Sequence, residues 1–146
     1  NLSDKTGENG AAVDEPVDQG ETILIVEDDP DVRTLAVALL SGLGYGIAEA
    51  GSAEAALKVM QHASNPIDLL LSNVVLPGVM NGPDLAAEVR RRSPGTKIVY
   101  MTGYAEEAFN NRFELNKDSG LLQKPFKKVE LARMVRSVLD NGGSRA

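Results

Sequence analysis

The residues most able to carry chemistry in this sequence stand directly after aliphatic runs. Acids follow the first such run, a carboxamide ends a second, a hydroxyl ends a third and an ammonium group follows a fourth. These residues are Glu27, Asp28, Asp29, Asn73, Thr102 and Lys124. One acidic run after a strand is most often a solvated helix start, but polar residues at four strand ends indicate a shared ligand site. We therefore expect these side chains to meet.

Their meeting depends on strands that alternate with helices. Continuous aliphatic and β-branched runs predict strands buried on both faces, at 22–26, 45–50, 68–73, 97–102 and 121–123. Apolar residues at helical spacing predict helices that start at Pro30 and after Ser52, and others at 82–92, 105–112 and 129–139. This alternation predicts an α/β fold with an open, doubly wound parallel sheet, because five βα units are too few for an eightfold barrel.

Composition limits the classes of function. A chain of 146 residues has room for one compact domain. The formal charge of −6 argues against a nucleic-acid surface. No apolar run approaches the roughly 20 residues that span a bilayer, so we expect no membrane contact by this segment. The absence of cysteine fits a reducing cytoplasm, where we expect the protein to act.

Three segments are expected along the chain. Residues 1–20 carry five acids against one lysine and little apolar surface, which predicts a flexible acidic linker. The folded domain is expected at 21–141 and a disordered tail at 142–146. The first residue is Asn1 rather than methionine, which suggests a fragment or a processed chain.

Four segments together resemble the signature of CheY-like receiver domains. They are Ile23 to Asp29, Asp68 to Gly78, Tyr100 to Gly103 and Lys124 to Phe126. The resemblance covers about residues 21–140 and is closest in motif to the C-terminal receivers of hybrid sensor histidine kinases. It implies a flavodoxin-like (βα)5 fold with strand order 2-1-3-4-5. It also implies a bacterial signalling module of two-component phosphorelays, not an enzyme, whose partner is a histidine kinase or a histidine phosphotransfer protein.

The resemblance also assigns roles to the residues at the strand ends. Glu27 and Asp28 match the acidic pair that holds Mg²⁺, with Asp28 as a direct ligand and Glu27 acting largely through water. Asn73 takes the phosphoacceptor position and a place among the metal ligands, to which Val75 adds its backbone carbonyl. Two further residues match the groups that bind phosphoryl oxygens, and these are Thr102 and Lys124.

The departure from the family pattern falls on Asn73. The family nucleophile is an aspartate, and a neutral amide does not form an acyl phosphate. The amide also removes one of three negative charges facing the metal, so Mg²⁺ affinity should fall and Lys124 should lose its natural ion partner, the carboxylate at position 73. Two explanations stay open: an introduced Asp-to-Asn change that blocks phosphorylation, or a natural receiver that acts as a phosphate-independent interaction module. The intact neighbours of Asn73 favour the first.

Other sites built from acids at strand ends fit less well. A phosphohydrolase of the haloacid-dehalogenase type needs further acids after the lysine, but only Glu130 and Asp140 follow Lys124, in the last predicted helix and at its end. A flavodoxin needs a hydroxyl- and glycine-rich phosphate loop where this chain has acids. An EF-hand calcium loop fails because residues 28–33 lack its central glycine.

Overall fold

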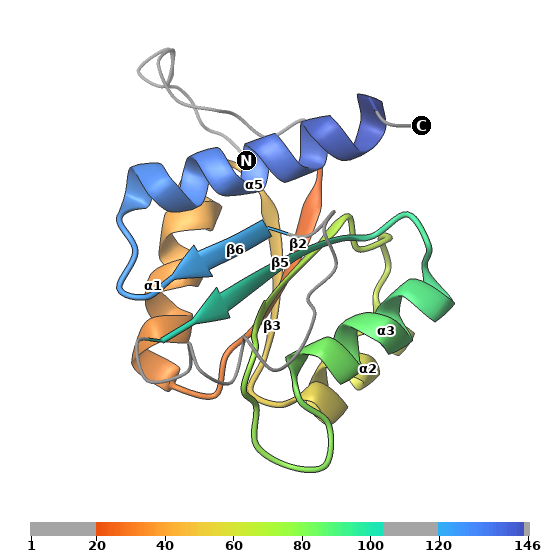
Figure 1. The fold of residues 1–146 in the computed structure, drawn as a ribbon. Helices are drawn as coiled ribbons and strands as arrows, with labels where there is room; N and C mark the ends of the chain where they lie inside the picture. Colours follow the sequence, from red (N-terminus) through yellow and green to blue (C-terminus); the bar gives the residue numbers. More distant parts are fainter. Residues whose placement is uncertain (1–19, 104–119, 145–146) are drawn as a thin grey trace.

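The computed structural model describes residues 20–103 and 120–144 (Figure 1). Within these residues, five parallel strands form one sheet in the order β3-β2-β4-β5-β6. The strands are β2 (Thr22–Val26), β3 (Gly46–Ala50), β4 (Leu69–Asn73), β5 (Lys97–Thr102) and β6 (Gly120–Gln123). The helices are α1 (Pro30–Gly42), α2 (Ala53–His62), α3 (Gly82–Arg92) and α5 (Lys128–Ser144). Counted along these strands, the order is 2-1-3-4-5, so the predicted flavodoxin-like fold is confirmed.

The sheet lies between two helical layers (Figure 1). One face packs against α1 and α5, and the other packs against α2 and α3. Successive residues of β2 therefore serve different cores, because neighbouring side chains in a strand point to opposite faces: Ile23 and Ile25 meet the first layer, and Leu24 and Val26 meet the second. All four of these side chains are fully buried, which explains the unbroken aliphatic run.

Element bounds differ from the predictions at a few places. Tyr45 is not in β3, because its N–H still bonds the Leu40 carbonyl at the end of α1. Asp68 stands just before β4 and accepts from the backbone N–H of Thr22 at 2.8 Å. The last helix continues past the predicted end to Ser144, so residues 142–144, expected in a disordered tail, are helical. Each residue added to an existing helix gains one further hydrogen bond, and here the helix continues although residues 142–143 are glycines, which are poor helix formers.

Some predictions fall on residues that the structure does not describe. The helix expected at 105–112 lies outside the described residues, as do 145–146 and all of the predicted linker except Gly20. In the parts that are described, no helix is long and apolar enough to cross a membrane.

Helix caps fix the loops at the carboxyl end of the sheet. Asp29 caps α1 and accepts from the N–H groups of Asp31 at 2.9 Å and Val32 at 3.4 Å. Asn81 and Asp84 form a reciprocal capping box at the start of α3. These caps satisfy N–H groups that have no partner within their own helix, and they hold both helix starts beside the strand ends.

Candidate functional site

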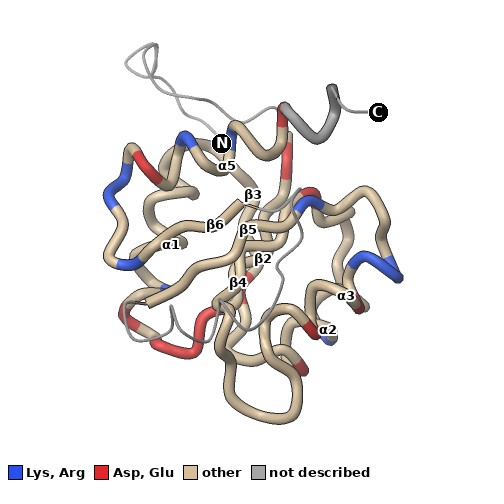
Figure 2. Tube along the Cα trace, viewed as in Figure 1, with Lys and Arg blue, Asp and Glu red and all other residues tan. Residues whose placement is uncertain are grey.

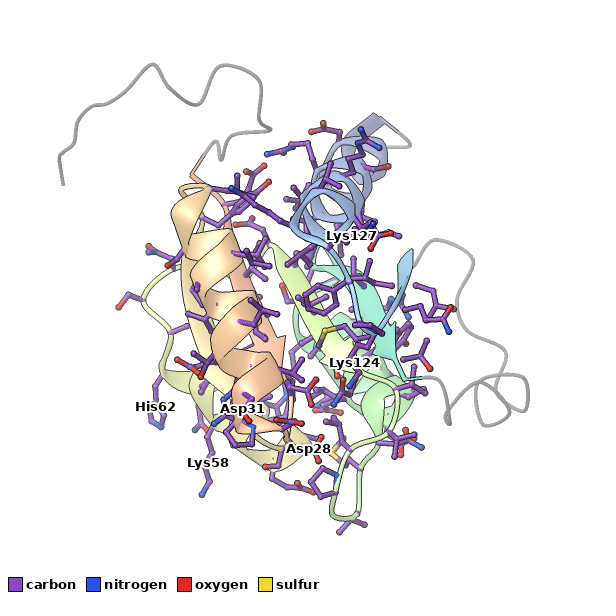
Figure 3. All side chains as sticks on the ribbon, turned by 90° about the vertical axis from the view of Figure 1, so that its left-hand side faces the viewer. Asp28, Asp31, Lys58, His62, Lys124 and Lys127 are labelled. Atoms are coloured by element: carbon purple, nitrogen blue, oxygen red, sulfur yellow. The ribbon has the colours of Figure 1, made fainter. Side chains whose placement is uncertain are left out.

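The predicted site residues lie at the carboxyl end of the sheet. Glu27 and Asp28 directly follow β2, and Asn73 ends β4, which pairs with β2. Lys124 follows β6, where its backbone N–H bonds the Thr102 carbonyl at 2.8 Å. Asp28 and Lys124 stand at the same end of the sheet (Figure 3). The acidic stretch after β2 appears in red at the lower left of Figure 2. Three strands therefore deliver acid, amide and ammonium groups to one place.

The Asn73 side chain is the centre of this group. Its Nδ2 donates to Glu27 Oε2 at 2.6 Å and to Asp28 Oδ1 at 3.0 Å. Its Oδ1 accepts from Lys124 Nζ at 3.1 Å. The opposite orientation would set the amide oxygen against two carboxylate oxygens and the amide N–H groups against an ammonium. The acceptors on one side and the Lys124 donor on the other therefore fix the orientation of the Asn73 amide.

Glu27 is a buried acid with a donor for each oxygen. It is 1% exposed. Its Oε2 accepts from Asn73 and from the backbone N–H of Asp29 at 3.0 Å, and its Oε1 accepts from Lys124 at 3.1 Å. A buried carboxylate costs several kcal/mol unless it is paired and hydrogen-bonded, and here both conditions hold. Lys124 forms its ion pair with Glu27, and its contact with residue 73 is a hydrogen bond to a neutral amide.

Thr102 and Val75 lie beside this network. Thr102 ends β5, the strand between β4 and β6, and is 2% exposed. Its hydroxyl donates to the carbonyl of Gly103 at 3.2 Å. Val75 lies in the loop after β4 and is partly exposed. The structure thus joins Glu27, Asp28, Asn73 and Lys124 by direct hydrogen bonds and sets Thr102 at the neighbouring strand end.

The carboxylate oxygens of this group suit a hard cation such as Mg²⁺. Oxygens of Glu27 and Asp28 converge on one point, as carboxylate ligands of Mg²⁺ do. Among the described residues no group of three or more His, Cys, Asp or Glu side chains could hold a metal. The predicted role of Asn73 as a metal ligand requires its side-chain oxygen to face the acids. The structure has its nitrogen there, so Asn73 as placed is not a ligand.

Arg33 is a site residue that the sequence analysis missed. Its Nη1 donates to the Glu27 backbone carbonyl at 2.7 Å, and its Nε donates to Glu49 Oε1 at 3.2 Å. The guanidinium thereby ties α1 to the ends of β2 and β3 and holds the backbone that carries the acid pair. A basic residue one turn into the helix that follows the acids was the available signal.

We expect Arg33→Met to lower the free energy of unfolding by about 1–2 kcal/mol, because the Glu27 carbonyl loses a charged donor. Urea denaturation measures this value. Arg91→Met is the matched control, since Arg91 pairs with Glu88 on the surface with its side chain 69% exposed and should give no measurable change. Equal losses in the two variants would contradict the role given to Arg33.

Gly82 is a second missed residue. It is buried at the start of α3, and its N–H bonds the Val74 carbonyl at 2.8 Å. A Cβ at this position would overlap the Asn73 carbonyl oxygen. In the sequence, Asn81-Gly82 indicates only a turn before the predicted helix at 82–92. Glycine is required at position 82 because the backbone at the start of α3 lies against the backbone of Asn73 and Val74.

Comparisons with known proteins agree with this architecture. The family model described as response regulator receiver domain matches residues 23–136. Sensor kinase CckA of Brucella abortus (strain 2308) is 38% identical over 119 residues, which cover 82% of this chain and 12% of the kinase. Response regulator receiver protein CpdR of the same organism is 32% identical over 117 residues, covering 80% of this chain and 95% of CpdR.

A solved structure gives the same result. The crystal structure of the receiver domain from hybrid histidine kinase CckA has a TM-score of 0.66 and 31% identity, covering 81% of this chain and 98% of that one. This chain spans about an eighth of the kinase relative and nearly all of CpdR. It therefore belongs to the response regulator receiver domain family of two-component signalling and is homologous to the receivers of hybrid kinases, as its motifs predicted.

Proposed function

We propose that this domain is the receiver of a phosphorelay, with position 73 as its phosphoacceptor position, and that Asn73 blocks the transfer. The observation that carries the proposal is the convergence of Glu27, Asp28 and Lys124 on the Asn73 side chain. In transfer to a carboxylate, one oxygen attacks phosphorus while the bond from phosphorus to the donor breaks. A neutral amide lacks the anionic oxygen for this attack, so the surrounding groups are in place but the nucleophile is missing.

The remaining groups supply position and charge. Glu27 and Asp28 would hold Mg²⁺ together with the Val75 carbonyl, and the ion would neutralise charge on the phosphoryl oxygens. Lys124 would pair with one phosphoryl oxygen, and the Thr102 hydroxyl would donate to another. Lys124 is well placed for this role, since its ammonium is already within 3.1 Å of the Asn73 oxygen. Most of the protein's contribution to such a transfer is placement of this kind.

The proposed partner is a histidine kinase or a histidine phosphotransfer protein. Two similarities support this proposal. The chain matches a small part of a sensor kinase and nearly the whole of a receiver protein. Restoring a carboxylate with Asn73→Asp and measuring labelling by acetyl phosphate tests the phosphoacceptor assignment without knowledge of the natural partner.

A second candidate function is a phosphate-independent interaction module. It is favoured by the hydrogen bonds that the site residues make to one another: Glu27 has three donors, and the Asn73 amide is engaged on both sides. The first function holds if Asn73 replaces a native aspartate, and the second holds if asparagine is the native residue. The native codon at position 73, together with the labelling result, decides between them.

A further inference from the structure

We propose that the Asn73 amide nitrogen is a built-in competitor of the divalent cation for the Glu27 and Asp28 carboxylates. The inference rests on the proposed assignment of that acid pair to Mg²⁺. It reverses the role expected of Asn73: the residue does not act as a weak ligand that helps to hold the metal. It keeps the metal out until its own hydrogen bonds are broken.

The Asn73 amide nitrogen lies between the two carboxylates. One atom, Asn73 Nδ2, lies 2.6 Å from an oxygen of Glu27 and 3.0 Å from an oxygen of Asp28. A point shared by two carboxylates is where a cation would bind, because Mg²⁺ takes carboxylate oxygens as ligands. The amide N–H groups carry partial positive charge and point to these oxygens. The amide N–H groups therefore occupy the position between the two carboxylates that the cation would take.

The Glu27 oxygen that faces Asn73 already accepts two hydrogen bonds. Glu27 Oε2 receives both the Asn73 side chain and the Asp29 backbone N–H, and Oε1 receives Lys124. A carboxylate oxygen has about two lone-pair sites, so Oε2 has none to spare. Because Glu27 is 1% exposed, water cannot easily replace a lost partner. A cation must then displace the amide to reach this oxygen.

Lys124 opposes a simple rotation of the Asn73 amide. Rotation by half a turn would present Oδ1 to the metal, but it would also aim Nδ2 at Lys124 Nζ, which now donates to Oδ1 at 3.1 Å. Lys124 and Nδ2 are both donors and cannot bond each other. The lysine therefore holds the amide in the orientation that opposes the metal.

Magnesium titration of three proteins, each with all 146 residues, tests the inference: the unmodified chain, Asn73→Ala and Asn73→Asp. Affinity is measured by calorimetry and by NMR shifts of the Asp28 and Asp29 backbone amides. Removing the competing donor should make Asn73→Ala bind Mg²⁺ about tenfold more tightly than the unmodified chain, since a hydrogen bond to a charged group is a strong one. Asn73→Asp should bind more tightly still. Adding Asp28→Asn to Asn73→Ala should abolish the gain.

A ligand role for Asn73 predicts a different order, with Asn73→Ala the weakest binder of the three. That order, or equal affinity of Asn73→Ala and the unmodified chain, would overturn the competitor role. If Asn73→Asp binds no Mg²⁺ either, the assignment of the acid pair to a metal has failed, and the competitor role fails with it. If Asn73→Asp binds Mg²⁺ tightly but Asn73→Ala binds it no more tightly than the unmodified chain does, only the competitor role is contradicted.

A second measurement does not depend on the folding of any variant. In the unmodified chain, saturating Mg²⁺ should shift the Asn73 side-chain NH₂ signals as their bonds to the acids break. This shift should follow the same titration curve as the Asp28 backbone amide. If the Asp28 signal moves and the Asn73 NH₂ signals do not, metal and amide bind together, and the inference is wrong.

Discussion

Asn73→Asp is expected to change this chain from one that takes no phosphoryl group into one that acetyl phosphate labels in a Mg²⁺-dependent way. The substitution supplies an anionic oxygen that attacks phosphorus while acetate leaves with the electrons of its bond to phosphorus. Lys124 already stands 3.1 Å from the oxygen of residue 73, and the acid pair stands beside it. Because this placement supplies most of the catalytic effect, exchanging the amide nitrogen of residue 73 for a carboxylate oxygen should be enough to allow labelling.

Intact-mass measurement detects the phosphoryl adduct directly. The control is Asn73→Asp combined with Lys124→Ala, which keeps the nucleophile but should weaken the response to the phosphate. Labelling of the unmodified chain would mean that another residue accepts phosphate, with Asp28 and Asp29 the first to examine. If Asn73→Asp folds and still takes no label, the phosphate-independent interaction module becomes the better account.

Gly82→Ala is expected to lower the free energy of unfolding by about 3 kcal/mol, at the upper end for overpacking of a buried position. The added Cβ would overlap the Asn73 carbonyl oxygen and approach the Asn73 carbon and the Val74 Cα, each to 3.0 Å. All three atoms belong to backbone, so no side chain can rotate away. The start of α3 must shift, which strains the hydrogen bond from Gly82 to the Val74 carbonyl.

The matched control is Gly42→Ala, which also adds a methyl group to a helical glycine. An added Cβ at Gly42 meets nothing within 4 Å, so stability should stay unchanged or rise by about 0.5 kcal/mol. Chemical denaturation of both variants measures the difference, and NMR shifts of the Asn73 side chain report whether the site moves with the helix. A neutral effect of Gly82→Ala would mean that α3 yields easily and that the close approach has no structural cost.

The sequence by itself determined the sheet and the list of candidate residues. Strand and helix signals are local: the aliphatic run of β2 and the helical spacing after Pro30 are each read within a few neighbours. Alternation of strands and helices then forces a parallel sheet, and a parallel sheet gathers its strand ends at one edge. For this reason Glu27, Asp28, Asn73 and Lys124 could be grouped before any distance was known.

Only the tertiary structure decided how these residues bond. The pair between Lys124 and Glu27 joins positions 97 residues apart, and the bond between Asn73 and Glu27 spans 46. No local pattern encodes which oxygen of a buried acid meets which donor, because that choice depends on the packing of three strands. The direction of the Asn73 amide is set in the same way, by a lysine on one side and two acids on the other. The family motif gives the place of Asn73 in the chain, whereas only the surrounding side chains decide that its nitrogen, and not its oxygen, faces Glu27 and Asp28.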